Sequence, residues 1–322
     1  MRRSWFYFGL ALLIVLSACR QTPEIIGNPN AELRYSICQE ALDQPLEDRA
    51  YQGFDGWFFF TLDLEEIYPF YRQTVFLTEL SRKFRAGGTT LIIVPVTGRA
   101  LVRPDMLYLG DPVQINFDPD RAEKAYVTFL STLGASGVQV FDTLEAARAY
   151  DASGGQTFFR RDLHWRSEGA KAIFEGVAGQ VKQLAPKLPK VNVTLERTSD
   201  DWHHGQFIER WTARNCGYRL PGEMQGIYTA TPIVTGSPSS DVVLVGSSFS
   251  IAPYNYDFLA AALQSEVLNV AVGAGGARVS LERYLTGETY QNHKPRVLVW
   301  EFPLYGEAFS PEEQAHFLGL IE

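Results

Sequence analysis

Apolar runs of strand length alternate with helical segments along most of this chain of 322 residues. Two runs, TTLIIVPV (89–96) and GVQVFD (137–142), lie in the first half, and VVLVG (242–246), VLNVAV (267–272) and RVLVWEF (296–302) lie in the last third. Continuous apolar runs are typical of strands buried on both faces of a parallel sheet. Helical crossovers would join such strands. The pattern therefore predicts an α/β fold with one mainly parallel sheet.

Segments with helical spacing separate these runs. Apolar residues recur every three or four positions in five of them, 71–85, 121–133, 170–184, 258–264 and 279–285. Before the first, QGFDGWFFF (52–60) predicts a turn that leads into a buried strand. The mixed stretch 188–240 is interpreted as an insertion or connection and not as a separate domain.

The N-terminal segment has the form of a secretion signal. Met1 to Cys19 reads MRRSWFYFGLALLIVLSAC, in which two arginines precede a short apolar run that ends in small residues. Because LSAC resembles a bacterial lipobox, residues 1–18 are predicted to be a lipoprotein signal peptide and Cys19 the lipidated residue. The alternatives are a plain signal peptide and an uncleaved anchor. Residues 19–36 are then a tether and 37–322 the folded domain, on the periplasmic side of a bacterial membrane.

Cysteine usage fits such an oxidising compartment. With Cys19 assigned to lipid, Cys38 and Cys216 are left as a disulfide pair, the alternative being two buried free thiols. Closing so long a loop would stabilise the fold by about 3 to 5 kcal/mol on the chain-entropy model.

The charge balance argues against a nucleic-acid partner. Lysine and arginine total 29 against 37 acidic residues, a net charge of −8, with no basic run after the N-terminus. Phosphate binding needs a positive footprint that this chain lacks. A polyanionic ligand would need a local basic patch, for which the candidates are Arg160, Arg161, Arg166 and Arg278.

A serine-rich turn follows one predicted strand. GSSFS (246–250) comes directly after VVLV and precedes a helical region. A turn there points the next side chain into the crevice at the carboxyl end of the sheet, where open α/β folds bind ligands, and nearby amides can form part of an oxyanion hole. Ser248, third in a Gly-x-Ser turn, is the first choice as nucleophile, with Ser247 and Ser250 as rivals. A polar turn or a helix cap is the structural alternative.

A second polar segment, RRDLHW (160–165), precedes the helix 170–184, for which Ser167 is the expected N-cap. In an extended stretch the side chains of Asp162 and His164 point the same way. The carboxylate could then orient the imidazole, which is free to act as a base through its other nitrogen. A structural histidine held by a neighbouring acid is the alternative. With Ser248, these two residues complete the set of groups that acyl transfer through a serine requires.

The remaining histidines are left outside the candidate site. His203 and His204 lie in DDWHHG (200–205), which is interpreted as a solvated or disulfide-neighbouring loop, since adjacent histidines without thiols are a weak metal signal. No metal and no cofactor is expected.

A glycine-rich turn follows the predicted strand VLNVAV (267–272). LNVAVGAGGARVS (268–280) places Gly273 where a backbone amide can approach a ligand, and Arg278 could meet a carboxylate sugar through two hydrogen bonds. The spacing is not that of a dinucleotide-binding fingerprint. A packing turn and a surface ion pair are the alternatives.

Taken together, these segments resemble a known family. RRDLHWRSEGA, VVLVGSSFS, LNVAVGAGGA and RVLVWEFP resemble the alginate O-acetyltransferase proteins of the AlgX and AlgJ type, within the SGNH hydrolase superfamily. The likeness runs from about Asp55 to Pro303. In ordinary SGNH enzymes the aspartate and histidine follow the serine, whereas here they precede it, as in the permuted arrangement of this family.

The resemblance implies an SGNH hydrolase-like three-layer α/β/α sandwich around a mainly parallel sheet. It implies Ser248 as nucleophile, His164 as general base and acid, and Asp162 as the group that orients the imidazole. Gly273 or a neighbouring amide would hold the oxyanion together with the Ser248 amide. Candidate sugar contacts are Arg278, Tyr254 and Tyr305.

Two departures from the family pattern are visible. Gly-Ser-Ser stands where the superfamily often has Gly-Asp-Ser, which leaves the three catalytic positions intact. The chain ends at Glu322, so no C-terminal carbohydrate-binding module is expected and polymer binding would come from a partner.

The resulting hypothesis is a lipid-anchored O-acetyltransferase that modifies an exopolysaccharide, alginate or a similar uronate polymer, during export. Expected partners are the polymer acceptor, an acetyl donor such as a membrane acyl-transfer protein, and other components of the export complex. The alternatives are an acetyl esterase that uses the same three residues and a non-catalytic polysaccharide-binding or assembly component.

Overall fold

The fold is described from a computed structural model of the chain, in which residues 24–25, 50–108, 116–203, 218–219, 222–232, 236–251, 257–274, 276–306 and 308–321 are described. Five residues singled out above lie outside these ranges, namely Cys19, Cys38, His204, Cys216 and Tyr254. The predicted lipidation and the predicted disulfide are therefore not tested by the structure. No helix in the described ranges combines the length and the apolar character needed to cross a membrane.

A five-stranded parallel sheet with strand order β10-β9-β11-β4-β5 forms the centre of the molecule. Its strands are β4 (Thr90–Val96), β5 (Gln139–Val140), β9 (Val242–Val245), β10 (Leu268–Asn269) and β11 (Val297–Pro303). Every residue of β9 and β11 is buried, and β4 is buried from its second residue on. The continuous apolar runs of the sequence arise because helices cover both faces of these strands. The predicted α/β architecture with a parallel sheet is confirmed.

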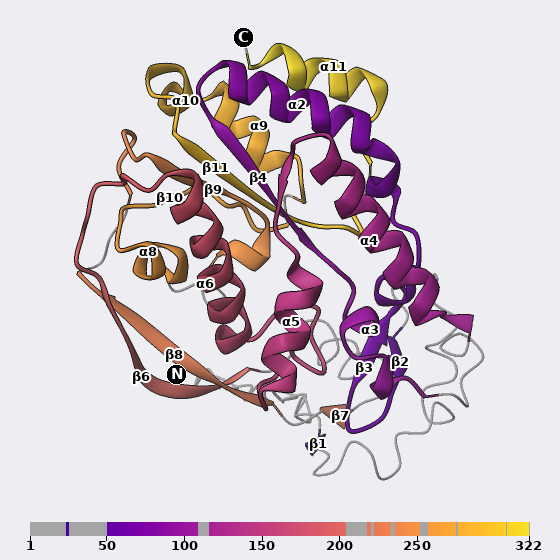
Figure 1. Cartoon of the computed structure of the whole chain (residues 1–322). Helices are drawn as coiled ribbons and strands as arrows, with labels where there is room; N and C mark the ends of the chain where they lie inside the picture. The colour runs from indigo at the N-terminus through magenta and orange to yellow at the C-terminus, as the bar shows by residue number, and fades with distance from the viewer. Residues whose placement is uncertain are drawn as a thin grey trace, which may run out of the picture.

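Helices form the two outer layers. Figure 1 shows α5 and α6 in front of the sheet with α8 beside α6, and α9 behind it. Helix α2 packs against β4 and α11, and α4 packs against α2 and β5. The bounds are α2 (Thr74–Ala86), α3 (Arg99–Val102), α4 (Pro119–Ala135), α5 (Thr143–Ala152), α6 (Ser167–Leu184), α8 (Phe258–Leu263), α9 (Val279–Thr286), α10 (Glu288–Asn292) and α11 (Pro311–Gly319).

Short elements complete the chain. Strands β2 (Ala50–Gln52) and β3 (Phe58–Phe60) form an antiparallel hairpin, and β1 (Glu24–Ile25) pairs with β7 (Tyr218–Arg219). Within the stretch 188–240, β6 (Thr194–His203) and β8 (Glu223–Thr231) form a long antiparallel ribbon whose strands contact α8 and α6. The 3₁₀ helices are η4 (Thr61–Leu64), η5 (Pro69–Gln73), η6 (Pro104–Met106) and η8 (Ser248–Ser250).

The sheet has a topological switch point at β9. From β9 the chain crosses through α8 to β10 on one side, and from β10 it returns through α9 and α10 to β11 on the other side of β9. Open α/β sheets bind ligands at the carboxyl end of the strands where the chain reverses in this way. The turn that contains Ser248 follows β9 directly.

One predicted helix boundary is wrong by a single position. The N-cap of α6 is Arg166, whose side chain makes no capping hydrogen bond, and Ser167 is the first helical residue. The Ser167 hydroxyl instead donates to the Gln225 side chain on β8 at 2.9 Å. Ser167 therefore ties the start of α6 to the ribbon and does not cap the helix.

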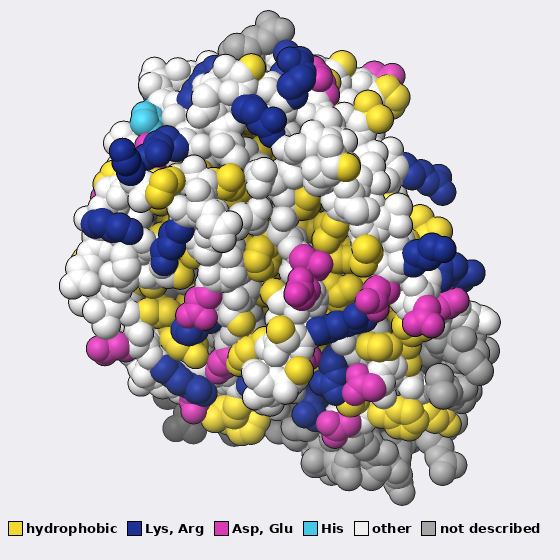
Figure 2. Space-filling model, in the orientation of Figure 1, with side chains coloured by type: hydrophobic (Ala, Val, Ile, Leu, Met, Phe, Trp, Pro, Cys, Tyr) yellow, Lys and Arg dark blue, Asp and Glu magenta, His cyan; other side chains and the backbone are white. Residues whose placement is uncertain are grey.

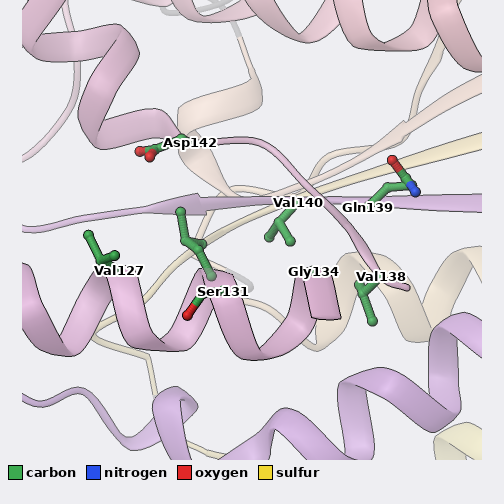
Figure 3. A pocket seen from close by; sticks show the side chains of 8 residues that line it. Val127, Ser131, Gly134, Val138, Gln139, Val140 and Asp142 are labelled. Carbon is green, nitrogen blue, oxygen red and sulfur yellow. The ribbon is translucent and has the colours of Figure 1, made fainter. Parts of the chain in front are cut away.

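The far edge of the sheet carries an open groove of about 450 Å³ between α4 and β5. Figure 3 shows α4, which carries Val127 and Ser131, alongside the chain segment 138–142. Two further strands, β4 and β11, separate β5 from β9. Asp142, the acidic residue of this groove, accepts a hydrogen bond from the Glu145 N–H as the N-cap of α5. The chemistry expected from the sequence does not lie in this groove.

Candidate active site

Ser248 is the accessible residue of a buried turn. Gly246, Ser247, Phe249 and Ser250 are all buried, whereas Ser248 is half-buried. The two rival serines are directed inward, because the hydroxyl groups of Ser247 and Ser250 both donate to the carboxylate of Glu301. The turn therefore offers Ser248 as its reachable hydroxyl.

The structure brings Ser248, His164 and Asp162 together as a hydrogen-bonded row. The Ser248 Oγ lies 2.8 Å from the His164 Nε2, and the His164 Nδ1 lies 2.6 Å from the Asp162 Oδ1. The same Asp162 oxygen accepts the His164 backbone N–H at 3.0 Å. Because a carboxylate only accepts, the Nδ1 carries a proton and the Nε2 is left to accept from the serine in the neutral imidazole. This is the geometry that a serine nucleophile with a histidine base requires.

Asp162 is held by a second histidine that the sequence interpretation missed. The His203 Nε2 lies 3.1 Å from the Asp162 Oδ2, and the His203 ring stacks on Phe159 with centroids 3.9 Å apart. The interpretation of DDWHHG as a solvated loop is wrong for His203, which is only 8% exposed and ends strand β6. Its neighbour Trp202 is 56% exposed. The apolar residue of this pair therefore faces solvent and the polar residue faces inward, which is the reverse of the usual alternation along a strand, so the sequence pattern does not reveal that His203 is buried.

The two histidines decide the charge of Asp162. Burial raises the pKa of this carboxyl, but hydrogen bonds from His164 and His203 more than offset burial and hold the pKa well below its ordinary value. Asp162 is therefore ionised at neutral pH although it is fully buried. An ionised carboxylate at this position stabilises an imidazolium that forms on His164.

A buried arginine fixes the loop that carries Asp162. Arg99 is 1% exposed and forms an ion pair with Asp63 through its Nε and Nη2 atoms. Its Nη1 donates to the carbonyl oxygens of Phe159 at 3.0 Å and Asp162 at 2.8 Å. A guanidinium presents several donors in a rigid fork, so one side chain can hold several carbonyls in place. Arg99 lay in a segment to which the sequence interpretation assigned no role.

Aromatic packing joins the histidine loop to the serine turn. The Trp165 Nε1 donates to the Phe249 carbonyl oxygen at 2.8 Å, and the two rings meet edge to face with centroids 5.0 Å apart. The Phe249 ring also lies 4.9 Å from the ring of His164. Each such aromatic pair is worth about 0.5 to 1.5 kcal/mol beyond its buried area. Trp165 and Phe249, which are 84 positions apart in the chain, thereby hold the histidine loop against the serine turn.

The predicted oxyanion and sugar contacts stay predictions, and the structure places three of the residues concerned. Gly273 lies in the exposed loop after β10, which runs beside the serine turn, since the Val272 N–H donates to the Gly246 carbonyl oxygen at 2.9 Å. Tyr305 is half-buried, and burial raises the pKa of its phenol well above the ordinary value. Arg278 pairs with Glu313 at 2.8 Å and lies over the ring of Phe309. The side chain of Arg278 thus contacts the C-terminal segment, as the surface ion-pair alternative described.

The predicted basic patch forms only in part, because Arg160 and Arg166 line one pocket together with Arg103, Arg197 and Glu168. Arg160 pairs with Asp55 at 3.1 Å, Arg166 lies 3.7 Å from Glu168, and Arg161 is buried. Figure 2 shows the same mixture over the face it presents, where blue basic and magenta acidic side chains lie interspersed. Within the described residues, Arg160, Arg166 and Arg278 each lie within 4 Å of a carboxylate. In the same ranges no group of three or more His, Cys, Asp or Glu side chains is arranged to hold a metal ion.

Comparisons with known proteins show the family to which this chain is related. The family described as "SGNH hydrolase-like domain, acetyltransferase AlgX" matches residues 50–304. "Alginate biosynthesis protein AlgX" of Pseudomonas syringae pv. tomato is 29% identical over 244 residues, which are 71% of this chain and 49% of that protein. "Probable alginate O-acetylase AlgJ" of Pseudomonas fluorescens is 26% identical over 238 residues, 69% of this chain and 58% of that protein. The chain thus spans about half the length of the curated relatives it matches.

Solved structures share the fold. The Pseudomonas aeruginosa AlgX structure superposes with a TM-score of 0.71 at 24% identity, covering 88% of this chain and 67% of that one. The O-acetyltransferase domain of Pseudomonas putida AlgJ superposes with a TM-score of 0.68 at 23% identity, covering 84% of this chain and 98% of that one. The predicted SGNH hydrolase-like fold is therefore confirmed. Because the family match extends over most of the chain, the protein belongs to the SGNH hydrolase-like acetyltransferase family of AlgX.

Proposed function

We propose that this protein is an O-acetyltransferase that transfers acetyl groups to hydroxyl groups of an exopolysaccharide, alginate or a similar uronate polymer, during export. The observation that carries the proposal is the hydrogen-bonded row from the Ser248 Oγ through His164 to Asp162. Membership of an acetyltransferase family that includes alginate biosynthesis proteins supports the choice of reaction and of polymer.

The proposed reaction has two halves with a covalent intermediate. In the first, the Ser248 Oγ attacks the acetyl carbonyl carbon of the donor and its proton moves to the His164 Nε2. The tetrahedral intermediate collapses, the bond to the leaving group breaks, and the imidazolium returns the proton to that group. In the second, a sugar hydroxyl gives its proton to the His164 Nε2 and attacks acetyl-Ser248, and the proton then returns to the Ser248 Oγ as the acetylated sugar leaves.

Asp162 serves both halves in this scheme. Its carboxylate keeps the proton of the imidazole on the Nδ1 and balances the positive charge of the imidazolium. The Ser248 amide is the proposed first oxyanion donor, since the leading N–H groups of a helical turn have no intrahelical partner. Gly273, whose loop runs beside the serine turn, is the proposed second donor.

The cellular setting follows from the proposed leader. A lipid at Cys19 and the tether 19–36 would hold the domain 37–322 at the periplasmic side of a membrane, where a Cys38–Cys216 disulfide can form. A membrane acyl-transfer protein would supply the acetyl group. Because Arg160, Arg166 and Arg278 each lie beside a carboxylate, we propose that an export-complex partner contributes to binding of a polyanionic polymer.

The proposal is tested by incubating the purified protein with a chromogenic acetyl ester and measuring the intact mass, with and without uronate oligosaccharides. The expected result is a single acetyl group on Ser248 in the protein alone and acetylated oligosaccharide when the acceptor is present. Ser248→Ala should take up no acetyl group, whereas Ser131→Ala, a matched change of an exposed serine on α4, should behave as wild type.

The alternative functions give different products. Acetate release without any acetylated oligosaccharide would identify an esterase. Full acetylation of the polymer in cells that carry only Ser248→Ala would identify a non-catalytic assembly component. Either result would contradict the proposed transferase.

A further inference from the structure

A buried carboxyl group lies directly beneath the serine turn. Glu301 belongs to β11, the central strand of the sheet, and is 0% exposed. Its Oε2 accepts the Ser247 N–H at 2.9 Å and the Ser250 hydroxyl at 2.7 Å, and its Oε1 accepts the Ser247 hydroxyl at 2.9 Å. One carboxyl group therefore holds the residue before Ser248 and the residue two positions after it.

The turn is shaped to admit this carboxyl group. A Cβ atom at Gly246 would lie 2.7 Å from the Glu301 Oε2 and 2.6 Å from the Ser250 Oγ, closer than side chains tolerate. The Gly246 N–H is held separately, by the Ser280 hydroxyl on α9 at 2.8 Å. The Ser247 Oγ, besides donating to Glu301, accepts the Phe249 N–H at 3.3 Å. The Ser247 hydroxyl therefore links Glu301 directly to the backbone of the turn.

Holding a carboxyl group at this place is costly. Within the described part of the chain no lysine, arginine or histidine forms an ion pair with Glu301. Burial raises the pKa of Glu301 to about 7, although the hydrogen bonds from Ser250 and Ser247 lower it. A buried carboxyl group weakens the fold when it is ionised. Its presence at this position is accounted for if its oxygen atoms form hydrogen bonds that an apolar side chain could not form.

We propose that Glu301 is a positioning residue for the nucleophile. Through its hydrogen bonds with Ser247 and Ser250, Glu301 holds the Ser248 Oγ within reach of the His164 Nε2. This inference rests on the proposed role of Ser248. Three hydrogen bonds from Ser247 and Ser250 to one carboxyl group fix the backbone on both sides of Ser248, and hence the place from which its side chain departs. The Ser248 Oγ and the His164 Nε2 lie 2.8 Å apart. A displacement of about 1 Å in a reacting group can lower a rate about 100-fold.

The test compares Glu301→Gln, Glu301→Ala and wild type in the rate at which phenylmethanesulfonyl fluoride labels Ser248, followed by intact mass. Labelling by a sulfonyl fluoride requires an activated serine and no acetyl chemistry. The matched control is Glu282→Gln, a glutamate on the surface of α9 that pairs with His316. The chromogenic acetyl ester gives the second rate, with kcat and KM determined separately.

The alanine variant is expected to lower both the labelling rate and kcat by about 10- to 100-fold with KM within about twofold of wild type. The glutamine variant should fall in between, because its amide oxygen can accept the Ser247 N–H and its NH₂ can donate to a serine oxygen. Ser247→Ala combined with Glu301→Ala should lose less than the product of the two single losses. Thermal unfolding of each variant shows whether the folded fraction accounts for the change.

Each result decides the inference. Labelling of Glu301→Ala at the wild-type rate, or a loss no larger than its unfolded fraction, would overturn it while leaving the proposed transferase intact. Slow labelling of Glu301→Ala together with a wild type that acetylates no sugar would support the inference and contradict the transferase. A wild type that resists the sulfonyl fluoride would overturn both.

Discussion

Arg99 holds the backbone of Asp162 from a different element of the fold, since its Nη1 donates to the Asp162 carbonyl oxygen at 2.8 Å. The guanidinium is itself fixed by Asp63, and its Nη2 also donates to the Phe58 carbonyl oxygen at 2.6 Å. The segment that carries the acid and the base is therefore tied, through Arg99, to strand β3 and to the 3₁₀ helix η4 that follows it. Stability and function are linked through this one side chain.

Replacing Arg99 by methionine tests that link. The change leaves the Asp63 carboxylate buried without its cation, so the free energy of unfolding should fall by about 3 to 5 kcal/mol in urea denaturation. The double variant Arg99→Met/Asp63→Leu removes both charges and should regain much of this stability. Its acetylation of Ser248 should stay low, because the donors to the Phe159 and Asp162 carbonyls are still missing. Equal activity in the double variant and wild type would contradict the assigned role, and Arg82→Met, an exposed arginine, is the control.

The second histidine on Asp162 predicts a shift of acid stability. The folded-state pKa of Asp162 is depressed, so this carboxylate contributes stability above its ordinary pKa that is lost as the pH falls toward the depressed value. His203→Leu removes one of the hydrogen bonds that lower the pKa, so acid unfolding should begin at a higher pH than in wild type. At neutral pH the variant should lose about 1.5 to 3 kcal/mol.

The measurement is urea denaturation over an acid pH series, with kcat at each pH. The control is His316→Leu, which removes an exposed histidine that pairs with Glu282. A His203→Leu protein whose acid unfolding coincides with that of wild type would show that this histidine does not sustain the charge of Asp162.

Glu301 predicts a pH dependence of opposite sign. Its folded-state pKa is raised from 4.5 to about 7, so the folded chain binds more protons than the unfolded chain between those values. The free energy of unfolding should therefore fall as the pH rises through this window, by up to about 3 kcal/mol, and stay level above it. Glu301→Gln has no proton to lose there. The difference in unfolding free energy between wild type and this variant should change between about pH 5 and about pH 8, and a constant difference would refute the prediction.

Two glycines on α6 should respond to alanine in opposite ways. A Cβ atom at Gly169 would lie 2.2 Å from the Thr157 carbonyl oxygen, whereas one at Gly179 meets nothing within 4 Å. Gly179→Ala should stabilise the protein by up to about 1 kcal/mol through helix propensity. Gly169→Ala should destabilise it by about 3 kcal/mol, because the clash is with backbone.

The same pair separates packing from catalysis. Gly169 lies five positions after His164, so a shift of the α6 N-terminus in Gly169→Ala should also lower the acetylation rate. Gly179→Ala should keep the wild-type rate. If Gly169→Ala unfolds at the same urea concentration as wild type, the close contact with Thr157 does not constrain this helix.

The sequence predicted the sheet because β4, β9 and β11 are buried on both faces and carry unbroken apolar runs. It also predicted which groups come together, because Ser248 follows a central strand and Asp162 and His164 share one short segment. Glu301 escaped notice since a single carboxyl inside RVLVWEF gives no periodic signal, and its partners lie more than 50 positions away. His203 escaped because its contact with Asp162 depends on how β6 and β8 pair, which local patterns do not specify.

Charge was predicted least well. The sequence analysis groups the arginines at 160, 161, 166 and 278 as one patch, yet Arg161 is buried and the other three each lie beside a carboxylate. Ion pairs between distant segments depend on side-chain geometry that composition does not encode. Arg99 donates to the carbonyl oxygens of Phe159 and Asp162, yet it lies in no motif that would have marked it in the sequence.

Strand β11 contributes none of the three side chains of the proposed catalytic row, yet it lies between β9 and β4 and joins the two halves of the sheet. A chain cut between Ser250 and β11 would keep the serine, the histidine and the aspartate but would lose the strand on which β9 and β4 both pair. The proposed chemistry therefore depends on a segment that a list of catalytic residues would omit.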